Sequence, residues 1–310
     1  MEKFDVVVCG PVSVDIIFSE IDKLPEPSEE IYCDDFEFTC GASYNTAVAL
    51  SRLGLKVAIL APVGNDFLSK FIIEKLEAEG VITTYMKSLD RPLRSLSVAL
   101  NYSGDRSFVS YEDEIQNFDY GAYVNSVLGN IETEYLHISA EKRTKSIIEY
   151  ANEKGIDVSL DVGWNKEWLH SPDLKKIIKL SNLFTPNLKE AQEITGESDP
   201  DRALAVLADL NPNNLIVVKL SEQGAIFKKS TTTEKVSGSK RIPVDTTGAG
   251  DVFSAGLLAG LIKGYEVRQA IQLGNFCGGC SVEGMGGTKT SPMWRDIPTE
   301  LIYPNRQEDL

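Results

Sequence analysis

Hydrophobic positions follow two periods along most of this chain, and the two periods alternate. Short continuous apolar runs are typical of buried strands, whereas apolar residues three or four positions apart indicate helices with one buried face. Runs of the first kind predict strands at 5–9, 56–63, 135–138, 156–162, 182–185, 215–220 and 225–228. Spacing of the second kind predicts helices at 45–53, 67–80, 144–154, 172–180, 189–195, 202–208, 252–263 and 267–282. Strands that alternate with helices imply a largely parallel sheet covered on both faces.

Two segments, 12–40 and 91–114, depart from this alternation of strands and helices and are predicted to form exposed β structure. Residues 95–102 and 106–111 alternate between apolar and polar, and Ser103-Gly104-Asp105 between them predicts a hairpin turn. We expect the two segments to form a small second sheet inserted in one α/β domain that spans residues 1–310.

The net charge of the chain disfavours two classes of binding partner. Thirty-one basic and forty-six acidic residues give a formal net charge of −15, which disfavours nucleic acids and anionic membrane surfaces. Residues 1–5 lack the basic stretch of a signal peptide, and the apolar run at 257–262 is too short to span a bilayer. Five sparse cysteines favour free thiols in a reducing cytoplasm, with Cys277 and Cys280 as a buried pair on a helix.

The strongest chemical motif is Asp245-Thr246-Thr247-Gly248-Ala249-Gly250-Asp251, which directly precedes an apolar helix. Glycines before a helix leave backbone N–H groups free at the positive end of the helix dipole, where they bind or stabilise phosphate charge. Asp251 at the same helix start could accept a hydroxyl proton. The alternative is an ordinary capped loop with Asp251 in the first helical turn.

Four other residues suit a polyol or a magnesium ion. Asp15 follows a buried strand and could accept hydrogen bonds from two hydroxyls, or it could cap a turn. Gly41 allows close backbone approach, and Asn45 offers both a donor and an acceptor, although an N-cap role would also suit it. Glu190 is a hard oxygen donor for an outer-shell role on Mg²⁺, or a first-turn helix glutamate.

The 245–251 motif resembles the signature of the ribokinase-like (PfkB) carbohydrate kinases. Three further motifs are similar to this family in order and spacing: Gly10-Pro11-Val12-Ser13-Val14-Asp15, Gly41-Ala42-Ser43-Tyr44-Asn45 and Thr185-Pro186-Asn187-Leu188-Lys189-Glu190. The resemblance covers nearly the whole chain. It implies a Rossmann-like three-layer α/β sandwich with a small β-sheet lid that closes over a sugar.

The resemblance also implies roles for individual residues. Asp251 would be the base, and Gly248, Ala249 and Gly250 would form the anion hole. Substrate contacts would come from Asp15, Gly41, Asn45 and, on the lid, Arg106. Magnesium and ATP would be bound by Asn187, Glu190 (through water), Lys219, Gly224 and Asn275, and a monovalent cation such as K⁺ would lie at Asp245 and Thr247.

The chain departs from the family pattern at two places. Cys40 stands where a second glycine is usual, which would reshape the sugar-binding turn. The nucleotide loop, usually Thr-x-Gly-x-x-Gly, reads Lys219-Leu220-Ser221-Glu222-Gln223-Gly224. Lys219 could reach a phosphate as a point charge or only mark the end of a strand.

The resemblance implies ATP-dependent phosphorylation of a hydroxymethyl group on a monosaccharide or sugar acid of the ribose, fructose or 2-keto-3-deoxygluconate type. A nucleoside kinase is the alternative enzyme, with Tyr44, Phe108 and Tyr111 around the base, and Arg106 could instead meet a sugar-acid carboxylate. A sugar-binding regulator without turnover is a third hypothesis. In relatives such lids often pair between subunits, so we also expect a homodimer through an apolar lid face formed by Phe36, Phe38, Leu96, Val98 and Leu100.

Other enzyme classes lack their motifs here. The sequence contains no G-x-x-x-x-G-K-[ST] loop, no G-x-G-x-x-G after a strand and no G-x-S-x-G elbow. The two histidines, His137 and His170, have no neighbouring metal-ligating partner in the sequence, so we expect a sheet-end or surface role for each.

Overall fold

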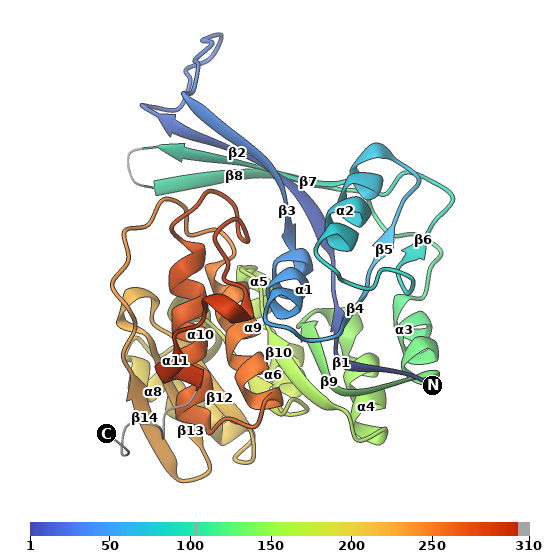
Figure 1. Ribbon diagram of the computed structural model, residues 1–310, viewed down its shortest axis with the longest axis vertical. Coiled ribbons are helices and arrows are strands. Elements are labelled where there is room, and N and C mark those ends of the chain that lie inside the picture. The colour runs from blue at the N-terminus through green and yellow to red at the C-terminus, as the bar shows by residue number, and fades with distance from the viewer. Residues whose placement is uncertain (103–104, 303–310) are drawn as a thin grey trace.

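The computed structural model describes residues 1–102 and 105–302; within this range the side chains of residues 105 and 106 are not described. Over these residues, one sheet contains eight strands in the order β14-β13-β12-β11-β10-β9-β1-β4 (Figure 1). These are β1 (Glu2–Cys9), β4 (Val57–Leu60), β9 (Ile131–Ser139), β10 (Asp157–Asp161), β11 (Leu183–Phe184), β12 (Leu215–Lys219), β13 (Ala225–Lys229) and β14 (Thr232–Val236). The strands from β4 to β12 run parallel, and β13 and β14 close one edge as antiparallel neighbours.

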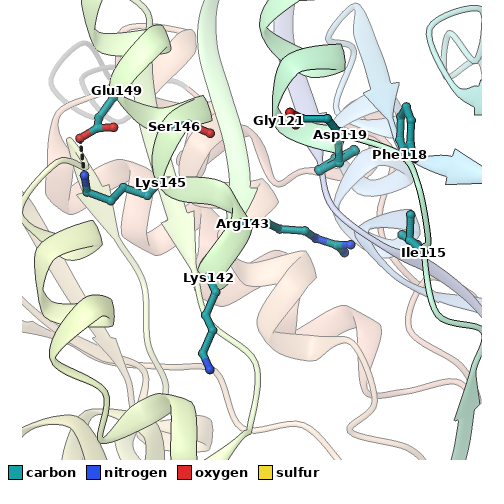
Figure 2. A pocket seen from close by; sticks show the side chains of 10 residues that line it. Ile115, Phe118, Asp119, Gly121, Lys142, Arg143, Lys145, Ser146 and Glu149 are labelled. Carbon is teal, nitrogen blue, oxygen red and sulfur yellow. Dashed lines mark hydrogen bonds and ion pairs between the residues drawn. The ribbon is translucent and has the colours of Figure 1, made fainter.

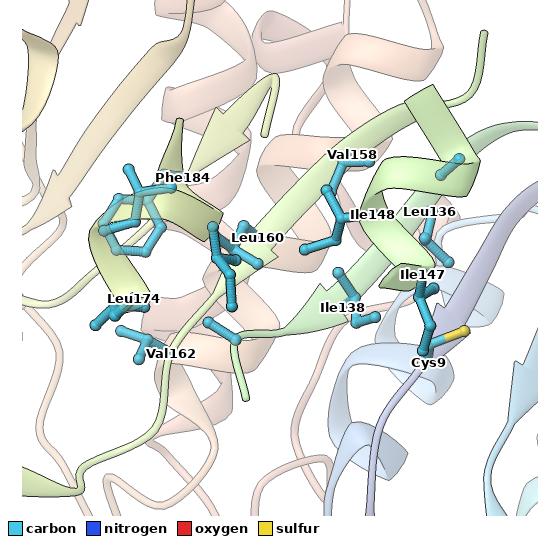
Figure 3. Close-up of a cluster of buried hydrophobic side chains, with 14 of the residues drawn as sticks. Cys9, Leu136, Ile138, Ile147, Ile148, Val158, Leu160, Val162, Leu174 and Phe184 are labelled. Atoms are coloured by element: carbon cyan, nitrogen blue, oxygen red, sulfur yellow. The ribbon is translucent and has the colours of Figure 1, made fainter. Parts of the chain in front are cut away.

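Helices cover both faces of this sheet because every parallel strand has apolar side chains on both sides. On one face, Val7 and Cys9 of β1 pack with residues of helices α3 to α8 in a single hydrophobic cluster (Figure 3). On the other face, Val6 and Val8 pack with α1, α2, α9 and α10. The helices are α1 (Ser43–Arg52), α2 (Phe67–Ala78), α3 (Tyr120–Leu128), α4 (Lys145–Glu153), α5 (Lys166–Leu169), α6 (Pro172–Ile178), α7 (Leu188–Thr195), α8 (Pro200–Leu210), α9 (Ala249–Ile262), α10 (Val267–Ser281) and α11 (Thr299–Ile302).

A second, four-stranded sheet projects from this sandwich, in the order β3-β2-β7-β8 (Figure 1). Its strands are β2 (Val12–Ile21), β3 (Asp35–Ala42), β7 (Ser95–Tyr102) and β8 (Asp105–Glu112). They come from the two segments 12–40 and 91–114 that the sequence sets apart, so the predicted α/β sandwich with a small lid sheet is confirmed. The predicted turn at 103–105 includes Ser103 and Gly104, which lie outside the described residues.

The strands and helices named from periodicity are present, with ends shifted by a few residues. Local capping explains several helix starts: Asp66 accepts a hydrogen bond from Ser69 N at the start of α2, and Asp199 caps α8, whose first residue is Pro200. The sequence reading missed α3 and the edge strand β14, as well as two short strands, β5 (Pro62–Val63) and β6 (Lys87–Ser88). In the described part of the chain, no helix is long and apolar enough to cross a membrane.

Candidate active site

Helix α9 begins at Ala249, directly after the glycine-rich motif. Its N-cap residue, Gly248, has a φ of 69°, a left-handed conformation that favours glycine. As a glycine, this N-cap residue supplies no side-chain hydrogen bond to the first turn. The amide groups of the first turn, including those of Gly250 and Asp251, therefore lie at a positive helix end without a capping side chain, as an anion hole requires.

Asp251, in this first turn, is held by Asn45 of α1. Asn45 Nδ2 donates a hydrogen bond to Asp251 Oδ2 at 2.9 Å. The Asn45 side chain is buried, and its Oδ1 has no hydrogen-bond partner among the described residues. It lies between two glycines: a Cβ added at Gly248 would come within 2.7 Å of Asn45 Nδ2, and one at Gly287 within 2.6 Å of Asn45 Cγ. Asn45 lies inside α1, whose N-cap is Ala42, so the N-cap alternative for Asn45 is wrong.

The surroundings of Asp251 make it a stronger base than an ordinary aspartate. Burial raises the pKa of the Asp251 carboxyl to about 6, although the hydrogen bond from Asn45 works in the opposite direction. The negative charges of Asp161 and Asp15 add to the rise, and the ammonium of Lys219 opposes it. A carboxylate with this pKa is ionised near neutral pH and can accept a proton from a hydroxyl.

Asp15 of β2 lies on the same face of the lid sheet as Gly41 of β3. Ser13 Oγ donates to Asp15 Oδ1 at 3.0 Å, and burial raises the pKa of the Asp15 carboxyl. A Cβ at Gly41 would lie 2.1 Å from Asp15 Oδ2, so only glycine leaves room for this carboxylate. Cys40 pairs with Val14 and therefore points to the opposite face. The Cys40 side chain therefore does not reach the face that carries Asp15, and any effect of this residue on the turn must come through its backbone.

Asn187 and Glu190 form a reciprocal cap at the start of α7. Asn187 Oδ1 accepts from Glu190 N at 2.9 Å, and Glu190 Oε2 accepts from Asn187 N at 2.8 Å. Burial raises the pKa of Glu190 to about 7, and Asp161 and Asp251 also raise it. The described residues contain no group of three His, Cys, Asp or Glu able to hold a metal ion. A magnesium ion here would therefore take most of its ligands from phosphate and water, which is the mode that Mg²⁺ prefers.

Lys219, the last residue of β12, forms an ion pair that the sequence did not indicate. Its Nζ donates to Asp161 Oδ2 at 3.0 Å and to Ser254 Oγ at 3.4 Å. A Cβ at Gly250 would lie 3.2 Å from the same nitrogen. The ammonium is thus adjacent to the first turn of α9.

Gly224 and Asn275, both expected at the nucleotide, contact one segment that follows β14. A Cβ at Gly224, whose φ is 93°, would lie 2.1 Å from Val236 O. Asn275 Nδ2 donates to Ser237 O at 3.2 Å. Both residues therefore contact the 236–238 backbone.

Asp245 is hydrogen-bonded within its own loop. Its Oδ1 accepts from Thr247 N at 3.0 Å and from Thr247 Oγ1 at 2.8 Å, and its Oδ2 accepts from Gly286 N at 2.9 Å. Asp245 thus joins the glycine-rich motif to the 284–287 loop. Arg106 belongs to β8, where its backbone pairs with Asn101, and its side chain lies outside the described part of the chain.

The histidines and cysteines lie away from this cluster or have ordinary partners. His137 is buried within β9, with its ring 3.1 Å from Ser159 Oγ, and burial lowers its pKa to about 4. His170 is exposed and lies 2.7 Å from Glu193. Cys277 is buried on α10 as expected, but Cys280 on the same helix is only half-buried, so the predicted buried pair is wrong for Cys280. All five cysteines are free thiols.

A cavity of about 520 Å³ lies elsewhere, between the first turns of α3 and α4 (Figure 2). Lys142, Arg143 and Asp119 are among its lining residues, and none of the predicted site residues lines it. Arg143 pairs with Glu141 at 2.7 Å, and Lys145 with Glu149 at 2.6 Å. None of the four motifs at 10–15, 41–45, 185–190 and 245–251 contributes a residue to this hollow.

Three residues of the cluster were missed from the sequence: Asp161, Ser254 and Gly287. Asp161 carries the one available signal, because it is an acid at the carboxyl end of a buried parallel strand. Ser254 and Gly287 carry no local signal, since their role depends on which elements meet in the fold.

Comparisons with known proteins match nearly the whole chain to one family. A family model described as pfkB family carbohydrate kinase matches residues 3–294. An ATP-dependent 6-phosphofructokinase of Thermoanaerobacterium thermosaccharolyticum is 26% identical over 287 residues, which cover 88% of this chain and 86% of that protein. A ribokinase of Bacillus subtilis is 26% identical over 298 residues, with 94% and 98% covered.

Solved structures show the same fold. The Arabidopsis thaliana ribokinase complexed with ribose and ATP has a TM-score of 0.80 at 21% identity and covers 97% of this chain, with 99% of its own chain matched. A putative ribokinase II from E. coli, in complex with ATP and Mg²⁺, has a TM-score of 0.79 at 23% identity, with 98% and 100% covered.

Proposed function

Since the chain belongs to the pfkB family of carbohydrate kinases, we propose that it transfers the γ-phosphoryl group of ATP to a hydroxymethyl group of a monosaccharide or sugar acid. The main support is the position of Asp251, ionised near neutral pH and hydrogen-bonded to Asn45, in the first turn of a helix whose N-cap residue is a glycine. A proton acceptor and an anion hole on one helical turn are the two parts that phosphoryl transfer to an alcohol needs.

In the proposed reaction, the oxygen of the sugar hydroxyl forms a bond to the γ-phosphorus of ATP. Asp251 accepts the proton of that hydroxyl at the same time. The bond from that phosphorus to the bridging oxygen of ADP breaks, and ADP leaves. The amides of Gly248, Ala249 and Gly250 stabilise the negative charge on the transferred group. Asp251 then returns its proton to solvent.

The sugar is bound from the lid side. Asp15, fixed by Ser13 and given room by Gly41, accepts hydrogen bonds from two neighbouring hydroxyls. Asn45 Oδ1 is buried without a partner among the described residues, and burying an acceptor in that way costs about 1–3 kcal/mol unless a ligand satisfies it. We assign it to a sugar hydroxyl. Arg106 is proposed to contact the substrate from β8.

ATP is proposed to lie between the start of α9 and the 236–238 segment flanked by Gly224 and Asn275. Mg²⁺ neutralises phosphate charge when bound, and Glu190 is proposed to contact it through water, with Asn187 fixing the carboxylate. Lys219 is proposed to act on the phosphate charge. Asp245 and Thr247 are proposed as the site of a monovalent cation such as K⁺, a role that would reorganise their present hydrogen bonds.

The acceptor class rests on the relatives and on the lid. Curated relatives at 26–27% identity are named as kinases of 6-phosphofructose, ribose, fructose and 2-dehydro-3-deoxygluconate. Of three aromatic residues considered for a nucleoside base, Tyr44 is buried and Tyr111 pairs with Leu96 on the lid face opposite Asp15. Phe108 shares the face of Asp15 and is 49% exposed. A single aromatic ring can stack on only one face of a nucleobase, so a sugar or sugar acid is favoured over a nucleoside.

A homodimer through the lid is also proposed. The face opposite Asp15 carries all five residues expected there, together with Val109, which is 68% exposed, and Tyr111. Phe38 packs on Phe71 of α2, with ring centroids 4.7 Å apart, and Leu96 packs against the core, so the exposed portion lies further along the sheet. A second lid would bury this portion.

Two assays test the proposed function. A thermal-shift panel of sugars, sugar acids and nucleosides, each with and without ADP, identifies the ligand class because only ligands of the folded state raise its stability. ADP release from ATP is then measured with every ligand that binds. We expect a sugar or sugar acid to shift the melting temperature and to support turnover. Binding of a sugar without any turnover would favour a regulator instead, and stabilisation by nucleosides alone would favour a nucleoside kinase.

A further inference from the structure

The ammonium of Lys219 is bound by side chains from two elements, β10 and α9, next to the anion hole. Asp161 ends β10, and its Oδ1 and Oδ2 lie 3.3 Å and 3.0 Å from Lys219 Nζ. Ser254 follows Gly250 by one helical turn on α9, and its Oγ donates to Asp161 Oδ2 at 2.9 Å. The same strand-end carboxylate therefore accepts from the lysine and from the helix that carries the anion hole.

The hydrogen-bond network around Lys219 extends to a third strand, β11. Thr185 Oγ1, just after β11, lies 3.1 Å from Ser254 Oγ. Ser254 and Thr185 are both buried, and the side chains of Lys219 and Asp161 are 12% and 13% exposed. The lysine has little freedom to follow a mobile ligand, because both oxygens of its partner carboxylate face it.

Lys219 remains charged at this position. Burial acts to lower the pKa of its ammonium, but the carboxylates of Asp161, Glu190 and Asp251 outweigh that effect and raise it. A buried ion pair contributes little net stability, since the cost of removing two charges from water offsets their attraction. A fixed buried cation beside a phosphate site therefore needs an explanation beyond folding.

We propose that Asp161 and Ser254 are positioning residues that hold Lys219 as a fixed positive charge beside Gly250, where it stabilises the phosphoryl group during transfer. The proposal rests on the proposed function. It differs from a nucleotide-binding role for Lys219, because a cation fixed in place acts mainly on the charge that redistributes in the transition state. Its removal should lower kcat and leave the KM for ATP nearly unchanged.

A double-mutant cycle separates this arrangement from independent roles of the two residues. We expect Lys219→Met to lower kcat by about 10²-fold or more, with the KM for ATP changed less than about threefold. Asp161→Asn should lower kcat by about tenfold, and the double variant should be no slower than Lys219→Met, because Asp161 acts through the lysine. Ser254→Ala should cost a few-fold. Lys229→Met, at the exposed end of β13, is the matched control and should keep full activity.

Additive losses in the double variant would overturn the proposal, as would a large rise in the KM for ATP with kcat retained. The double variant removes both charges together, so it leaves no unpaired buried ion. If Lys219→Met fails to fold, the double variant is compared with wild type and should itself lower kcat by about 10²-fold or more with the KM for ATP nearly unchanged.

A binding measurement gives a readout that does not depend on turnover. ADP affinity is measured calorimetrically with and without aluminium fluoride, which with ADP mimics a phosphoryl group in transfer. We expect Lys219→Met to keep the affinity for ADP within a few-fold of wild type. The factor by which aluminium fluoride increases the affinity for ADP should be at least tenfold smaller than in wild type. An unchanged gain would overturn the proposal alone, since the wild-type protein would still bind and turn over nucleotide. A wild-type protein that neither binds ADP nor consumes ATP would contradict the proposed function and this inference together.

Discussion

Asn45 Nδ2 of α1 donates a hydrogen bond to Asp251 Oδ2 of α9 at 2.9 Å, and this bond joins helices from opposite ends of the chain. The bond engages Asp251 Oδ2, so Oδ1 is the oxygen that remains for a substrate proton. Gly248 and Gly287 enclose the same amide, so its orientation is set by packing as well as by the hydrogen bond. Asn45 thus fixes the direction of the carboxylate and contributes to its pKa.

Replacing Asn45 should therefore alter the pH dependence of the reaction. In Asn45→Leu the carboxylate loses a donor that lowers its pKa, so the pKa of Asp251 should rise above its present value of about 6. Asp251 must be ionised to act as a base. We expect the acidic limb of the kcat profile to move up by about one pH unit, and kcat at its optimum to fall about tenfold.

Asp15→Asn is the comparison for that experiment. It should raise the KM for the sugar and leave the acidic limb of kcat in place, because Asp15 is proposed to contact hydroxyls and not to position the base. An Asn45→Leu variant with a raised sugar KM and an unmoved limb would limit Asn45 to substrate binding.

The two glycines beside Asn45 give a second prediction. A Cβ at Gly287 would lie 2.6 Å from Asn45 Cγ and Oδ1, so Gly287→Ala must displace the amide from Asp251. We expect kcat to fall by about tenfold or more. The matched control is Gly163→Ala, because a Cβ at Gly163 meets no atom within 4 Å and its φ is not in the left-handed region. Equal activities of the two variants would show that the Asn45 position is not critical.

The pKa of Asp251 also predicts how stability changes with pH. Its folded-state pKa of about 6 lies above the unfolded value of about 3.9, so the unfolded state loses this proton first. The free energy of unfolding therefore falls as the pH rises from about 4 to about 6 and is level above that range. Asp251→Asn removes this penalty. The variant should be more stable than wild type at pH 8 by on the order of 2 kcal/mol, and the difference should shrink as the pH falls from 6 towards 4.

Chemical denaturation across that pH range checks this prediction. Asp209→Asn, an exposed position on α8, serves as the control. A stability difference that stays constant from pH 8 to pH 4 would mean that Asp251 does not have a raised pKa.

The proposed dimer can be tested on the lid. Wild type should sediment as a dimer at micromolar concentration, and the double variant Phe36→Glu/Val109→Glu should be monomeric, because two charges would face the partner lid. Val206→Glu, at an exposed position on α8, should remain a dimer. A monomeric wild type would contradict the proposal.

Local patterns in the sequence were sufficient for most of the fold and for the parts of the site that lie on one segment. The start of α9 follows from Gly248 and the apolar run after it, and the lid follows from two alternating segments. Helix α3 was missed although Tyr120, Val124 and Leu128 recur four residues apart and are buried, because Gly121 and Gly129 lower the helix propensity of that stretch. Strand β14 was missed because Thr232–Val236 is mostly polar, as an edge strand can be.

Contacts between distant segments could not be predicted in the same way. The partners of Asp251 and Lys219 depend on the order β12-β11-β10 in the sheet and on the packing of α1 against α9. No local period encodes that order. Asn45 could be selected as a polar residue near a glycine, but its hydrogen bond to Asp251 follows only from the fold.

The measurement that tests the central claim most directly is the steady-state kinetics of Asp251→Asn with its best sugar substrate. The substitution keeps the size of the side chain and an acceptor for Asn45, but it removes the proton acceptor. We predict that kcat falls by at least about 10²-fold while the KM for the sugar stays within a few-fold. A variant that retains kcat and shows a greatly raised sugar KM would make Asp251 a binding residue and contradict its assignment as the base.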